Sequence, residues 1–144
     1  MSLLLPLLSV LFLGGCQSEE EVKRSQYLAE GYQLYQTHCA NCHQADGSGL
    51  GNLYPPIVAE SLQDKATLIC WIKHGINRPM VIEGITYSRP MPANPTLKDL
   101  EIAEIVTYMT DTWGNDKDLT SIESVQNALN QCDLSTAPKA PQAR

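Results

Sequence analysis

The stretch Cys39-Ala40-Asn41-Cys42-His43 places two thiols two residues apart and an imidazole directly after the second thiol. This C-x-x-C-H arrangement predicts covalent attachment of one c-type haem, because each thiol can add to a porphyrin vinyl group while the imidazole binds the iron. The alternatives are a redox-active dithiol or half of a zinc site. A zinc site needs further ligands at similar spacing, and a dithiol motif follows a thioredoxin-like strand. The sequence contains neither feature.

Helical periodicity surrounds this motif. Apolar residues at intervals of three and four predict a first helix from Val22 to about Thr37. By the same criterion, further helices are expected from about Lys65 to His74, from after Thr96 to Trp113, and from about Ile122 to Cys132. The intervening loops, 44–60 and 76–95, are too long for a compact domain unless a large apolar group fills the core.

Composition limits the classes of protein that this chain can be. With 144 residues, of which 43% are hydrophobic and 18% charged, it is predicted to form one folded domain. The net charge of −6 and the scattered Lys and Arg residues exclude nucleic acid as a partner. The acidity favours a partner with a basic docking surface.

The N-terminal sequence predicts export and lipid attachment. The uncharged run Leu3–Leu13 is too short to span a bilayer and is typical of a signal peptide, which we place at residues 1–15. It ends in Leu13-Gly14-Gly15-Cys16, which resembles the cleavage site of bacterial lipoproteins and makes Cys16 the expected lipidated residue. Residues 16–25 would then form an acidic tether, although their glutamates also suit a helical first turn. The alternative is an ordinary secretory signal with an unmodified Cys16.

Together these features resemble a class I c-type cytochrome over about residues 26–114. The family has a glycine and an aromatic residue on the helix before the haem cysteines, here Gly31 and Tyr35, and an aromatic partner on the last helix, here Tyr108. A glycine-rich turn, here 46–51, follows the haem histidine. The resemblance implies an all-α cytochrome c fold, with three to four helices and long loops wrapped around one covalently bound haem.

The resemblance also implies the remaining haem contacts. The carbonyl of Pro55 is expected to accept the N–H of His43, with Pro56 as the alternative. A methionine that precedes a proline just before the last helix is expected to bind the iron, which points to Met91. Met80 or an open sixth position are the alternatives, while His74 would give a bis-histidine centre. The expected iron ligands are thus His43 and Met91.

Several polar side chains could bond to the haem propionates, because buried negative charge needs hydrogen-bond donors. The candidates are Arg78, Arg89, Tyr54, Tyr87 and Trp71. The sequence does not single out one of them.

Five cysteines are present, and two remain after lipid and haem are assigned. In an oxidising compartment Cys70 and Cys132 are expected to form a disulfide, with two unpaired thiols as the alternative. Such a bond would link an extension at residues 115–134 to the domain. Residues 135–144 are expected to form a disordered tail.

The sequence therefore predicts an electron-transfer protein and not an enzyme. A closed His/Met centre moves single electrons between redox proteins and needs no small-molecule substrate. The expected location is the periplasmic side of a bacterial membrane, or the cell surface, with a lipid anchor. The alternatives are a haem enzyme or gas sensor with an open sixth site, and a haem subunit of a larger oxidoreductase complex.

Overall fold

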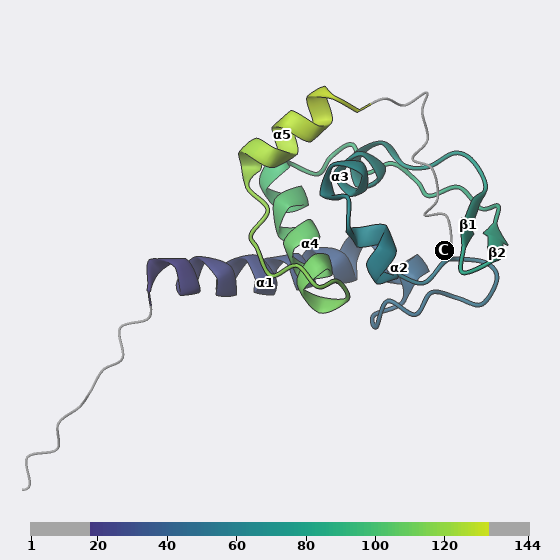
Figure 1. Cartoon of the computed structure of the whole chain (residues 1–144), viewed down its shortest axis with the longest axis horizontal. Helices are drawn as coiled ribbons and strands as arrows, with labels where there is room; N and C mark the ends of the chain where they lie inside the picture. Colours follow the sequence, from purple (N-terminus) through teal and green to yellow (C-terminus); the bar gives the residue numbers. More distant parts are fainter. Residues whose placement is uncertain (1–17, 133–144) are drawn as a thin grey trace, which may run out of the picture.

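The computed structural model describes residues 18–132. Over this part of the chain the elements form a helical domain with one small hairpin at its edge (Figure 1). In chain order they are α1 (Glu19–His38), α2 (Ala40–His43), the 3-10 helix η1 (Ala59–Leu62), α3 (Lys65–His74), β1 (Met80–Ile82), β2 (Ile85–Tyr87), α4 (Asp99–Thr112) and α5 (Ile122–Asn130). The mainly helical architecture expected from the sequence is confirmed.

Helices α1 and α4 pack closely where they cross. Gly31 of α1 lies against the backbone of Glu104, and a Cβ at position 31 would come within 2.7 Å of the Cβ of Tyr108. The central part of α4 is buried, with Ile102, Ile105 and Val106 fully excluded from solvent. Because a larger residue at position 31 would force the helices apart, this glycine sets their separation.

The helices begin where side chains cap them. Ser18 and Glu21 form a reciprocal capping box at the start of α1, so the residues expected to form an acidic tether are helical from Glu19 onward. Helix α4 begins at Asp99, later than the start expected after Thr96, because the Glu101 carboxylate accepts the Lys98 N–H. The capping interaction, and not the first polar residue after the prolines, sets this boundary.

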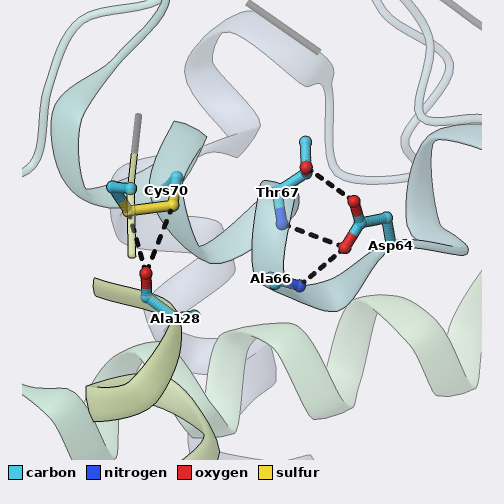
Figure 2. Close-up of a disulfide and its surroundings, with 6 residues drawn as sticks. Asp64, Ala66, Thr67, Cys70 and Ala128 are labelled. Carbon is cyan, nitrogen blue, oxygen red and sulfur yellow. Dashed lines mark hydrogen bonds between the residues drawn. A yellow bond between two sulfur atoms is a disulfide. The ribbon is translucent and has the colours of Figure 1, made fainter. Parts of the chain in front are cut away.

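The segment after α4 folds back onto the domain. The Thr120 N–H donates to the buried hydroxyl of Thr107, and Val125 of α5 is fully buried. A disulfide joins Cys70 of α3 to Cys132 just after α5, with a Cα to Cα distance of 5.8 Å. Figure 2 shows this bond beside the Ala128 carbonyl, with the Asp64 cap at the start of the same helix α3.

The loop expected over residues 76–95 contains a feature that the sequence analysis did not predict. Strands β1 and β2 pair in antiparallel register, with Met80 opposite Tyr87 and Ile82 opposite Ile85. The two turn residues, Glu83 and Gly84, have positive φ angles of 50° and 79°. The helix count also differs from the expected three to four, because the haem motif itself forms the short helix α2.

Some predictions concern residues beyond the described part of the chain. The signal peptide at 1–15, the lipidated Cys16 and the tail at 135–144 all lie outside residues 18–132. Within that range, no helix combines the length and the apolar character needed to cross a bilayer.

Candidate haem site

The C-x-x-C-H motif lies at the junction of α1 and α2. The Cys39 N–H donates to the Tyr35 carbonyl and so ends α1, while the N–H groups of Cys42 and His43 donate to the Cys39 carbonyl. These bonds turn the chain sharply and start the single turn of α2. The motif is thus held by a long helix on one side and by a tight turn on the other.

The His43 ring is fixed by the backbone of Pro55. Its Nδ1 lies 3.0 Å from the Pro55 carbonyl oxygen, so Nδ1 carries the proton and Nε2 is left free to bind a metal. Partial burial lowers the pKa of His43, and the hydrogen bond to Pro55 opposes that effect. The neutral imidazole that burial favours is the form that binds iron.

Gly49 brings the Pro55 carbonyl close to His43. Gly49 has a φ of +70°, and a Cβ there would lie 2.5 Å from the Tyr54 oxygen and 2.6 Å from the Pro55 carbonyl carbon. Its N–H also donates to the His43 carbonyl. Only glycine allows both this backbone conformation and this close approach, which explains the glycine-rich turn.

Met91 is held by α3 through the residues that follow that helix. Ile76 and Met91 form an isolated antiparallel bridge, in which the backbone nitrogen of each residue lies 2.9 Å from the carbonyl oxygen of the other. A Cβ on Gly75 would lie 2.5 Å from the Met91 carbonyl oxygen. The backbone of Met91 is therefore fixed to the end of α3 despite its position in a long loop.

These residues line one cavity with almost entirely apolar walls. Counting all space up to its open mouth, solvent included, its volume is about 650 Å³. It is lined by Cys39, His43, Pro55, Pro56, Ile57, Ser61, Leu62, Leu68, Trp71, Ile72, Ile76, Met80, Ile82, Met91 and Met109. One thiol of the motif, the oriented imidazole and three thioethers thus face a cavity suited to a large apolar group, so these residues fit a haem.

The two motif cysteines are free thiols here and stand in for the thioether sulfurs that haem attachment creates. Burial, together with the neighbouring Cys42 thiol, raises the pKa of Cys39 to about 12. A site that disfavours the thiolate so strongly suits a neutral thioether.

Some of the other candidate residues line the cavity and others do not. Met80 lines the cavity along with Met91, whereas His74 lies exposed at the end of α3 and does not contribute to the lining. Trp71 also lines the cavity. Outside the lining, the Arg89 guanidinium lies 5.6 Å from the centre of the Tyr54 ring and 3.5 Å from its hydroxyl oxygen.

A family model for cytochrome c matches residues 28–113. The chain belongs to the cytochrome c family. It is therefore a haem protein of electron transfer, with one covalently attached haem c, and the C-x-x-C-H motif and the apolar cavity agree with this assignment.

Relatives of two kinds resemble this cytochrome. Two Thermus thermophilus proteins named cytochrome c-552 are 31% and 33% identical, over 77% and 62% of this chain and 73% and 72% of their own lengths. The cytochrome c subunit of a quinone alcohol dehydrogenase from Gluconobacter oxydans is 31% identical, over 59% of this chain but only 18% of its own length. The similarity thus extends to cytochrome c modules within larger subunits.

The sequence analysis did not predict that the β1–β2 hairpin forms one wall of the cavity. Met80 and Ile82 are two residues apart on β1, lie on the same face of the strand and line the cavity. The signal was present in Val81-Ile82-Glu83-Gly84-Ile85-Thr86-Tyr87, where β-branched and aromatic residues flank a two-residue turn that ends in glycine. Met109, expected in the core, is buried and lines the same cavity.

Proposed function

We propose that this cytochrome carries single electrons on a haem whose axial ligands are His43 and Met91, and that a lipid on Cys16 tethers it to a membrane outside the cytoplasm. Bound haem supplies the Fe(II)/Fe(III) couple. The protein residues orient the ligands, exclude water and surround the ring with apolar side chains, which together set the reduction potential.

The observation that carries the ligand assignment is the shared cavity. His43 and Met91 both line it, and each is fixed by the backbone, His43 through Pro55 and Met91 through Ile76. When the backbone holds both ligands in the same place in the oxidised and the reduced protein, electron transfer requires little structural rearrangement. The arrangement therefore favours an electron carrier over an enzyme or sensor with an open position.

Binding of carbon monoxide to the reduced protein tests this assignment. Carbon monoxide needs a free sixth position, so wild type is expected to bind it poorly and Met91→Ala to bind it readily. Met80→Leu is the matched control, because Met80 lines the same cavity but is not the assigned ligand. Ready binding by wild type would favour the enzyme or sensor alternative, and ready binding by Met80→Leu alone would move the ligand role to Met80.

The tether is supported by where the folded domain begins. Helix α1 starts at Glu19, three residues after Cys16, so a lipid on Cys16 would hold the domain close to the bilayer surface. Several acyl chains on one residue give durable attachment, because each buried methylene adds ~0.8 kcal/mol. An exported carrier held in this way meets redox partners that lie in or on the same membrane.

Cell fractionation tests the tether. Wild type is expected in the membrane fraction, released by detergent but not by high salt, whereas Cys16→Ser should be released with the soluble periplasmic proteins. Gln26→Ser at an exposed position of α1 serves as the control and should remain with the membrane. Equal distribution of wild type and Cys16→Ser would reject the lipid.

A second function is favoured by the relatives that are named as cytochrome subunits of alcohol, gluconate and fructose dehydrogenases. This chain could serve as the haem subunit of such a complex. Native electrophoresis after gentle detergent extraction separates the two functions. Comigration with a dehydrogenase chain would support the subunit, and migration alone would support the free carrier.

A further inference from the structure

Four aromatic rings form a continuous cluster between the haem-binding segment and the surface. Ring centres lie 4.9 Å apart for Tyr35 and Trp113, 5.5 Å for Trp113 and Tyr108, and 5.7 Å for Tyr108 and Tyr32. Tyr35 and Tyr108 also contact each other directly, at 5.7 Å. The cluster holds three of the six tyrosines and one of the two tryptophans in the chain.

The inner end of this cluster touches the haem-binding segment. Tyr35 is fully buried, and its hydroxyl donates to the carbonyl of Gln44, the residue directly after His43. Trp113 lies so close to Gly47 that a Cβ there would come within 2.7 Å of its ring. The outer end is Tyr32 of α1, whose surface is 43% exposed.

Helix packing explains only part of this arrangement. The crossing of α1 and α4 needs buried side chains such as Tyr35, but it does not need a large ring at exposed position 32. Among the aromatic side chains, tyrosine and tryptophan lose an electron most readily. We propose that Tyr35, Trp113 and Tyr108 conduct an oxidising equivalent from the haem site to Tyr32, where it is discharged at the surface.

The protonation of the two end tyrosines gives the path its direction. The Tyr35 hydroxyl donates to a backbone carbonyl, which accepts a hydrogen bond but cannot take the proton, so an oxidised Tyr35 must take an electron from its neighbour. Tyr32 faces water and can release its phenolic proton on oxidation. The oxidising equivalent therefore comes to rest at Tyr32.

The oxidant in this proposal is hydrogen peroxide, which takes up two electrons and two protons and becomes two water molecules. One electron comes from the reduced haem and the second from Tyr32, which also gives up its phenolic proton; water supplies the other proton. Ordinary electron carriage leaves the tyrosines unoxidised, because their potentials lie well above those at which cytochromes work. The path thus protects the haem only when a strong oxidant reaches it.

Spin trapping with peptide mapping tests the proposal. The reduced holoprotein is treated with hydrogen peroxide and a nitroso spin trap, and the modified residue is located by mass spectrometry. We expect the adduct on Tyr32 in wild type and in the control Tyr54→Phe, which removes a tyrosine outside the cluster. We expect its loss in Tyr32→Phe and its decrease in Tyr108→Phe, which keeps the packing but removes an oxidisable ring.

Three results would overturn the proposal. They are the absence of a Tyr32 adduct, a dominant adduct on Tyr54, and a Tyr32 adduct of unchanged yield in Tyr108→Phe, since the last would mean direct attack from solvent. Unchanged visible spectra and circular dichroism of the phenylalanine variants establish that they fold. The proposal rests on haem attachment at Cys39 and Cys42 but not on Met91, so the carbon monoxide test can fail independently of it.

Discussion

Gly31 of α1 lies so close to α4 that a Cβ on it would come within 2.7 Å of the Cβ of Tyr108. The Cα of Gly31 thus lies in contact with the backbone of α4. This crossing positions the haem motif at the end of α1 and also the aromatic cluster.

Gly31→Ala is therefore expected to destabilise the domain. Inserting a methyl group into this crossing forces α1 and α4 apart, which costs about 1–3 kcal/mol in overpacked cores. Denaturant unfolding of the holoprotein measures the loss. The matched control is Gln33→Ala on the exposed side of the same helix, which should stay within about 0.5 kcal/mol of wild type. Equal stability of both variants would contradict the close packing.

Gly49→Ala is expected to weaken the hydrogen bond between Pro55 and His43. The added Cβ meets the Tyr54 oxygen at 2.5 Å and pushes the Pro55 carbonyl away from the imidazole. A histidine that loses this bond donates less electron density to the iron, so the reduction potential should rise. Potentiometric titration measures it.

Gly51→Ala is the control for that experiment. Gly51 also has a positive φ, of +51°, but nothing lies within 4 Å of a Cβ placed there. It therefore carries the conformational penalty without the contact, and the potential should stay at the wild-type value. A rise of equal size in both variants would mean that backbone strain, and not the Pro55 contact, is responsible.

Removal of the disulfide is expected to lower stability. Cys70 and Cys132 are 62 residues apart, and closing a loop of that length stabilises by about 4 kcal/mol at most in the chain-entropy model. The double variant with serine at both positions should unfold at lower denaturant concentration. Wild type treated with a thiol reductant should approach the same midpoint, and a midpoint insensitive to both changes would argue against the bond.

Glu104 gives a pH dependence with a definite sign. Burial, with smaller contributions from Glu30 and Glu101, raises the pKa of its carboxyl in the folded state. Between the two pKa values the folded protein binds more protons than the unfolded chain. The contribution of protonated Glu104 to the free energy of unfolding is therefore complete below the unfolded pKa and is lost as pH rises through the folded pKa. Glu104→Gln lacks this loss.

Unfolding of wild type and Glu104→Gln across the acidic to neutral range measures the effect. The variant should gain stability relative to wild type as pH rises, because only wild type must ionise a buried acid. A constant difference between the two curves would show that Glu104 titrates alike in both states.

Local patterns in the sequence predicted the helices better than the loops. The helix over Lys65–His74 was predicted with its observed bounds, and in the structure Asp64 caps its start and Gly75 ends it. The start of α4 was placed too early because the capping role of Glu101 was not considered. Helix ends follow from side chains within a few residues, so such signals can be seen in the sequence.

The loops depend on contacts between distant residues. The Ile76 to Met91 bridge joins residues whose proximity no local pattern encodes. The hairpin has a local signal, but that signal does not show that Met80 reaches the cavity wall. The approach of Pro55 to His43 was expected only through the family resemblance. Met91 as the sixth ligand stays a prediction, because two other methionines line the same cavity.

The most direct measurement of the central claim is the visible spectrum of the oxidised protein, recorded for wild type, Met91→Ala and Met80→Leu. A methionine sulfur bound to ferric haem gives a weak far-red charge-transfer band. If His43 and Met91 are the axial ligands, the band is present in wild type and Met80→Leu and absent in Met91→Ala. A band that survives in Met91→Ala, or is missing from wild type, would contradict the account.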